Sequence, residues 1–328
     1  MGGESQDHGG VVCEDLKLCK NMDSHYLQTL INVENFETAN TVLSVFLDFY
    51  GNVMYDHHYD AVRTQREADA HIILQMFFSK ALHFKHLLEG VIFKNDRLNM
   101  NRILDPTLLF TLVRNQYECL CLFELINIIP NSEERKDFLS LIHQISGLKY
   151  RQRFKSQATT TESICKLEKE AEIIDSYVQI VKSSSVFKTL DLTSKNVVHE
   201  AIKHRKYQLF FKNDTKLQEL GWKDFADKFG MKKNCIYNLY SYLCLNAHPS
   251  YPSIMQFRDA FAKNDPKFIR MALFATQTFI IFLSVFIVDY MKMFPVIIKD
   301  FKRLSEETQM ILTIYNDTFR EDGYKMAL

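Results

Sequence analysis

His248 is the side chain in this sequence best suited to acid–base chemistry. It follows the aromatic helical pattern NLYSYLCLNA and is itself followed by Pro249. Proline disfavours a helical conformation at the residue before it, so the sequence predicts that His248 lies at a rigid helix C-terminus. A histidine fixed there suits a general acid or base, because imidazole titrates near neutral pH. It equally suits a structural cap whose ring bonds the last helix carbonyls. Tyr240 and Asn246, in the same stretch, complete this group of candidate catalytic residues.

A second candidate group is the pair Arg114 and Glu118 in the segment LLFTLVRNQYECLCLFELI. That segment is apolar nearly all round, which predicts a central helix. The two charges are four residues apart and share one helix face. A charged pair in such a helix is costly unless the charges are paired or functional. The pair could be an internal salt bridge that fixes helix register, or an anion-binding arginine held by a glutamate.

Two stretches, LKYRQRFK (148–155) and KHRKYQLFFK (203–212), interleave basic and aromatic residues. Such runs could bind RNA phosphates and stack on bases, but they are also typical of solvated helix faces with aromatic side chains in the core. Lys+Arg and Asp+Glu balance at 40 each, so any contact with nucleic acid must come from a local patch. The candidate nucleic-acid-binding residues are Lys149, Arg151, Arg153, Lys203 and Arg205.

We expect no metal and no cofactor. His199 and His204 lie in a segment similar to the zinc-protease helix, but they are five residues apart and therefore point about 140° from each other on a regular helix. There is no glycine-rich phosphate loop and no nucleophile elbow. The sequence has 7 cysteines, an odd number that cannot all pair within the chain, and no Cys-x-x-Cys motif. This pattern predicts reduced thiols in a cytoplasmic protein.

The elements that position these residues are expected to be helices. Hydrophobic residues make up 47% of the chain, which excludes wholesale disorder, and only 10 glycines and 6 prolines are available for turns. The sequence predicts an all-α multi-helix bundle of about nine helices. One helix is expected to start at the Asp105 cap and Pro106, and others at 194–211 and 232–247. We expect residues 1–22 to form a disordered tail and 23–328 a single helical domain, within which 105–256 could form a core unit.

The helix expected at about 267–293 could be a membrane span or a core helix. Residues 271–288 carry no charge, which is at the lower edge of the length needed to cross a bilayer. Thr276, Gln277, Thr278 and Ser284 interrupt the apolar run, and no second segment resembles it. These features favour a buried apolar helix and make contact with a membrane unlikely.

These motifs together resemble an uncharacterised family of all-helical bacterial proteins. The likeness rests on Arg114-x-x-x-Glu118, then Trp222, the aromatic run 237–242 and His248-Pro249-Ser250, and it covers roughly residues 107–256. Domains of that family are similar to the HEPN superfamily of prokaryotic helical bundles, many of which are ribonucleases of toxin–antitoxin and anti-phage systems. The resemblance implies that a histidine transfers a proton during attack of a ribose 2′-hydroxyl and that an arginine stabilises the phosphate charge.

The sequence departs from the HEPN pattern in one respect. That pattern places an arginine a few residues before the histidine, where Ser241, Tyr242 and Leu243 stand here. Only His248 inherits its role directly, and Arg114 would have to substitute from another helix. Two functions are therefore expected: a metal-independent ribonuclease or defence effector that binds RNA, or a non-catalytic interaction protein that forms a homodimer or binds a partner protein.

Overall fold

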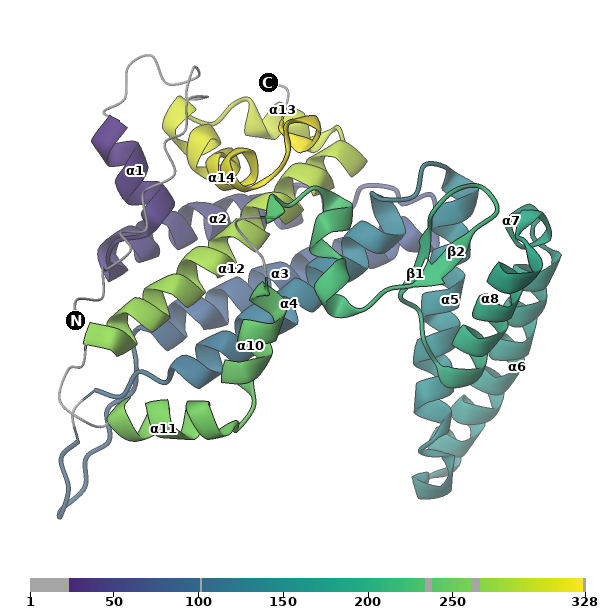
Figure 1. The fold of residues 1–328 in the computed structure, drawn as a ribbon, viewed down its shortest axis with the longest axis horizontal. Coiled ribbons are helices and arrows are strands. Elements are labelled where there is room, and N and C mark those ends of the chain that lie inside the picture. The colour runs from purple at the N-terminus through teal and green to yellow at the C-terminus, as the bar shows by residue number, and fades with distance from the viewer. Residues whose placement is uncertain (1–23, 101, 234–237, 261–265, 327–328) are drawn as a thin grey trace, which may run out of the picture.

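The structure is a computed structural model that describes residues 24–100, 102–233, 238–260 and 266–326. The tail expected at 1–22 lies outside the described residues. Within them the fold is all-α, as predicted, apart from one short β-hairpin (Figure 1).

The first half of the chain forms the helices α1 (Ser24–Asn32), α2 (Phe36–Asp56), α3 (Gln65–Leu88), α4 (Pro106–Asn127), α5 (Glu133–Gln152) and α6 (Thr161–Ser183). The second half contributes α7 (Ser185–Thr189), α8 (Leu192–His204), the strands β1 (Leu209–Phe211) and β2 (Leu217–Glu219), α10 (Leu239–Ala247), α11 (Tyr251–Ala260), α12 (Pro266–Met293), α13 (Ile297–Phe301) and α14 (Glu306–Phe319). Four 3₁₀-helices complete the described elements: η1 (Lys155–Gln157), η2 (Trp222–Asp224), η3 (Ala226–Phe229) and η4 (Asp322–Tyr324).

Helix α12 is the centre of the bundle. Its aromatic side chains stack on those of α3, with 3.8 Å between the ring centroids of Phe77 and Phe286 and 4.2 Å between those of Phe84 and Phe279. Phe123 of α4 packs edge-on against Phe286 from the other side. Of the described elements, only this helix is long and apolar enough to cross a membrane, and 78% of its apolar window is buried inside the protein.

The polar residues of α12 bond to protein groups. Gln277 donates to the carbonyl of Ile31 at 2.7 Å, and the hydroxyl of Ser284 donates to Leu312 O at 2.6 Å while accepting from Asn316 N at 3.0 Å. Tyr50 of α2 donates to Leu283 O. These bonds join α12 to α1, α2 and α14. The polar side chains of this helix are therefore satisfied by neighbouring parts of the protein, as expected for a buried core helix.

Helices α5, α6, α7 and α8 form a second group that projects from the central bundle, together with the β1–β2 hairpin (Figure 1). Its apolar side chains, such as Ile142, Val181 and Val198, belong to the same contiguous core cluster as those around α12.

Two expected helices end or begin elsewhere, and one observed helix was not expected. Residues 194–211 are divided: Arg205 adopts a left-handed conformation (φ 59°) that ends α8, and a strand follows because Asn213 accepts two backbone N–H groups in the hairpin turn. The helix expected at 232–247 is observed as α10 from Leu239, because Asn238 before it adopts a left-handed conformation (φ 59°); 234–237 lie outside the described residues. Helix α11, which follows the prolines, has no counterpart among the expected helices; Ser250 caps it by accepting from Ser253 N.

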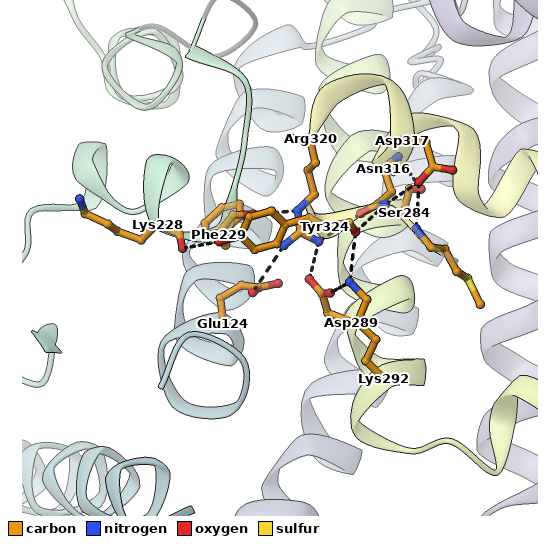
Figure 2. A network of polar contacts seen from close by, with 11 residues as sticks. Glu124, Lys228, Phe229, Ser284, Asp289, Lys292, Asn316, Asp317, Arg320 and Tyr324 are labelled. Carbon is orange, nitrogen blue, oxygen red and sulfur yellow. Dashed lines mark hydrogen bonds and ion pairs between the residues drawn. The ribbon is translucent and has the colours of Figure 1, made fainter. Parts of the chain in front are cut away.

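Arg320 joins the last part of the chain to the core. Its side chain is fully buried, and Nη1 lies 2.5 Å from Asp289 Oδ2 on α12. Nε donates to the carbonyl of Phe229 at 2.7 Å, and the guanidinium lies 4.5 Å from the ring centroid of Tyr324. Figure 2 shows Arg320, Asp289 and Glu124 of α4 converging from three elements.

Glu124 has no hydrogen-bond partner for either carboxylate oxygen among the described residues, although it is fully buried. Arg320 Nη2 lies 4.0 Å from Glu124 Oε2, which is an ion-pair distance but too long for a hydrogen bond. Burial, reinforced by the carboxylate of Asp289, raises the pKa of Glu124 well above its ordinary value, and Arg320 only partly opposes this. Burial therefore favours the protonated form of Glu124 more strongly in the folded protein than in the unfolded chain.

Removal of the Arg320 charge should destabilise the fold strongly. Arg320→Met leaves Asp289 buried with only Lys292 as its cation, and loss of one partner of a buried pair costs about 3–5 kcal/mol. The control is Arg303→Met, because Arg303 is 79% exposed and its pair with Asp300 is worth about 0–1 kcal/mol. Urea unfolding measures the free energy of unfolding of both variants. If Arg320→Met lowers it no more than the control does, Arg320 does not stabilise the core as proposed here.

The protonation of Glu124 should appear as a pH dependence of stability. The folded state holds a proton that the unfolded state releases above the ordinary glutamate pKa, so this contribution to stability is present at low pH and is lost as pH rises toward the raised pKa. The Gln side chain in Glu124→Gln does not titrate, so the variant does not lose this stability as pH rises. The stability of the variant relative to the parent should therefore increase between pH 5 and pH 8, by up to about 1.4 kcal/mol per pH unit.

Urea unfolding at pH 5 and pH 8 checks this expectation. The exposed Glu168→Gln on α6 is the control and should show no such change. An equal effect of Glu124→Gln at both pH values would show that Glu124 is ionised in the folded protein.

Candidate functional site

Four of the five candidate catalytic residues meet where α10 packs on α4. Arg114 Nε donates to Glu118 Oε1 at 3.0 Å, and Arg114 Nη2 donates to the Tyr240 hydroxyl at 3.2 Å. The Tyr240 hydroxyl donates to Glu118 Oε1 at 3.0 Å. Arg114 Nη1 lies 2.5 Å from Nε2 of His248. Arg114 is thus the centre of a polar cluster formed by residues more than a hundred positions apart in sequence.

Aromatic contacts set the register of the two helices. The rings of Tyr117 and Tyr240 lie 5.5 Å apart, and Phe110 meets Tyr242 edge-on at the same distance. Tyr242 also packs edge-on against Phe274 of α12. Since Tyr240 and Tyr242 both contact α4, the C-terminal end of α10 and its histidine are brought to the turn of α4 that carries Arg114.

The protonation states in the cluster follow from these contacts. Burial disfavours the charge of Arg114, but the hydrogen bond with Tyr240 and the carboxylate of Glu118 outweigh it and raise the arginine pKa. Burial, followed by the charge of Glu118, raises the pKa of Tyr240, so its hydroxyl keeps its proton. A guanidinium can only donate, so the Nε2 atom of His248 is the acceptor of this hydrogen bond.

The His248 ring is not what caps α10. The backbone N–H of His248 donates to Cys244 O, and the side chain of Ser250 donates to Leu245 O at 2.8 Å. Ser253, which is buried, donates to His248 O. Backbone and serine groups therefore satisfy the helix end, and the exposed imidazole is left for Arg114.

Asn246 does not join the cluster. Its side chain is buried and donates to the carbonyl of Tyr242, one turn earlier in the same helix. This contact gives Asn246 a local structural role in α10.

The candidate nucleic-acid-binding residues lie on the projecting helices, away from α10 (Figure 1). Arg151 forms two contacts with the buried Glu170, at 2.9 and 2.6 Å, and Arg153 lies over the ring of Tyr150. Lys203 lies 3.6 Å from Glu200, Arg205 accepts at its carbonyl from Ser146, and Lys149 is half-buried. The structure therefore does not place these basic residues beside His248.

Trp222 lies next to this cluster, although it is not among the candidate site residues taken from the sequence. Its ring lies 6.3 Å from that of Tyr240 at an interplanar angle of 29°, and its carbonyl accepts from the Tyr117 hydroxyl at 2.7 Å. The signals in the sequence are that it is the sole tryptophan, in a short segment before α10, and that it belongs to the motifs on which the family resemblance rests.

The described part of the chain contains no group of three or more His, Cys, Asp or Glu side chains able to hold a metal ion. Comparison with protein-family models, with curated proteins and with solved structures finds no match to this chain. The geometry of the cluster is therefore the basis on which a function can be inferred.

That geometry combines a proton acceptor with a cation. A phosphate that approached Arg114 would compete with His248 for the guanidinium, since Arg binds phosphate oxygens through charge-assisted hydrogen bonds. Release of His248 Nε2 from the guanidinium would then leave this nitrogen next to the bound phosphate. Glu118 and Tyr240 would keep the guanidinium in place during this exchange.

Substitution of His248 should leave stability nearly unchanged. Since the exposed ring does not cap the helix, we expect His248→Ala to melt within about 2 °C of the parent, as for other surface substitutions. Ser253→Ala, which removes a buried hydroxyl that bonds the helix end, should lower the melting temperature by about 2–4 °C. Thermal unfolding of both variants tests this, and the reverse order would identify the histidine as the structural cap.

Proposed function

We propose that this protein is a metal-independent ribonuclease that acts through His248. The observation that carries the proposal is the contact between His248 Nε2 and the Arg114 guanidinium, which combines a proton acceptor and a phosphate-binding cation in one exposed cluster. The likeness to HEPN bundles supports the same chemistry and suggests a role in a toxin or anti-phage system.

In the proposed reaction, Arg114 binds the phosphate of the scissile bond and His248 Nε2 takes the proton of the neighbouring ribose 2′-hydroxyl. The 2′-oxygen attacks phosphorus, the bond to the 5′-oxygen breaks, and that oxygen takes a proton from water. The products are a 2′,3′-cyclic phosphate and a 5′-hydroxyl end. Glu118 and Tyr240 are positioning residues that fix the Arg114 side chain.

The cleavage assay uses 5′-labelled RNA and the full chain with EDTA present. We expect cleavage by the parent, and losses of about 10²- to 10⁴-fold for His248→Ala and about 10²-fold or more for Arg114→Ala. Arg114→Lys should not restore the parent rate, because a lysine cannot reproduce the guanidinium contacts with Tyr240 and Glu118.

The matched control is His86→Ala, because His86 is 67% exposed on α3 and lies outside the cluster. It should cleave at the parent rate. Equal cleavage by parent and His248→Ala would show that the activity is not that of this site, and absence of cleavage by the parent on varied RNAs would reject the proposed function.

A second candidate is a non-catalytic interaction protein. It is favoured by exposed apolar side chains on α11, where Tyr251 is 74% and Ile254 56% exposed. A second copy of this chain is the partner that a purified sample can reveal. Light scattering that gave a dimer for the parent and a monomer for Ile254→Glu would favour this function, and a monomer for both would count against a homodimer.

A further inference from the structure

A cavity of about 350 Å³ lies directly beside the Arg114 cluster. Its walls come from α4, from the η2–η3 segment and from the start of α10. The residues that line it include Tyr117, Lys223, Asp227, Lys233, Asn238 and Tyr240. Tyr240 belongs to both features, because it lines the cavity and its hydroxyl contacts Arg114 and Glu118. A ligand in the cavity would therefore contact a residue that bonds directly to Arg114.

The charged groups of the cavity are available to a ligand. Lys223, Lys233 and Asp227 are exposed and form no ion pair with another described residue. Asp224, by contrast, accepts from the backbone N–H of Gly221 at 3.2 Å. The cavity thus offers two ammonium groups for an anion and one free carboxylate, with the Asn238 amide nearby, for N–H donors.

The lining of the cavity includes two aromatic residues, Tyr240 and Tyr117. The Tyr240 ring is supported on one side by Trp222, in a nearly parallel arrangement, and lies 5.5 Å from Tyr117. Leu239 and Ala226 extend this wall. A flat ring stacked on Tyr240 could carry an anionic group to the lysines while its edge faced Asp227. The volume is at the lower end of the about 300–1,000 Å³ range of small-molecule sites.

We propose that this cavity binds a guanine nucleotide. Guanine carries two adjacent N–H donors, at N1 and at the 2-amino group, which match the two oxygens of one carboxylate. The corresponding edges of adenine and cytosine pair one donor with an acceptor, and that of uracil has a single donor between two acceptors. The Asp227 carboxylate therefore selects guanine, and Lys223 and Lys233 bind the phosphate.

The nucleotide could be part of RNA or free. Because Tyr240 joins the cavity to Arg114, a guanosine of an RNA chain seated here would place its neighbouring phosphate at the cluster. That source rests on the proposed function, whereas binding of the free nucleotide does not. A guanosine within RNA and a free guanine nucleotide offer the same groups to the cavity, so only an experiment can distinguish these two sources.

Calorimetric titration of the full chain with GMP, AMP, CMP and UMP tests the site, and the fluorescence of Trp222, the sole tryptophan, reports whether the ligand reaches the Tyr240 wall. We expect GMP to bind about tenfold or more tightly than the other three and to change the fluorescence. Asp227→Asn should abolish the preference for GMP. The double change Lys223→Ala with Lys233→Ala should weaken all four nucleotides.

Matched controls are the exposed Asp175→Asn and Lys169→Ala on α6, which should bind GMP as the parent does. Equal affinity for the four nucleotides, or no binding, would overturn the proposal, as would a preference for GMP that survives Asp227→Asn.

A cleavage assay on RNAs with and without guanosine separates this proposal from the proposed function. His248→Ala should bind GMP normally but not cleave. GMP binding without cleavage of any RNA would support a site for a free nucleotide and reject the ribonuclease. Cleavage without GMP binding and without preference for guanosine would keep the ribonuclease and reject the pocket.

Discussion

The buried guanidinium of Arg320 is the contact on which the rest of the structure depends. It lies between two carboxylates, Asp289 on α12 and Glu124 on α4, in a region where neither acid has access to water. Arg320 pairs closely with Asp289 at 2.5 Å and lies 4.0 Å from Glu124, so burial outweighs its effect on Glu124 and the pKa of that acid is raised. The arginine thereby fixes the charge state of the core as well as the position of the chain end.

The same residue sets the path of the chain toward the candidate site. Arg320 bonds to Phe229 O, and the adjacent backbone continues this pairing, with Glu321 N donating to Gly230 O and Lys232 N to Phe319 O. Gly230 has φ +78°, and a Cβ atom there would lie 2.2 Å from the Tyr324 ring, so only glycine fits this turn. Since the η2–η3 segment precedes α10, the C-terminal residues hold one wall of the cavity while α4 provides the other.

Local signals are sufficient for much of the helical framework, because caps and periodicity act over a few residues. Asp105 and Pro106 begin α4 as predicted, and the polar residues of α12 indicate a core helix because each needs a protein partner. Residues linked by distant contacts are harder to predict. Nothing near Arg320 in sequence shows that Asp289 lies beside it, and Asn246 is polar in sequence although its amide is used within its own helix.

Arg320 and Arg114 differ in how exposed they are and in how easily their contacts can be replaced. Arg320 is enclosed, and its charge is consumed by groups that cannot move without unfolding the core. Arg114 is 25% exposed, and one of its contacts is to an imidazole nitrogen that an anion could replace. Exchange of that contact costs little, because the ring would remain in solvent, whereas the contacts with Glu118 and Tyr240 would persist. A cation that is held firmly on one side and replaceably on the other is what recognition of a phosphate requires.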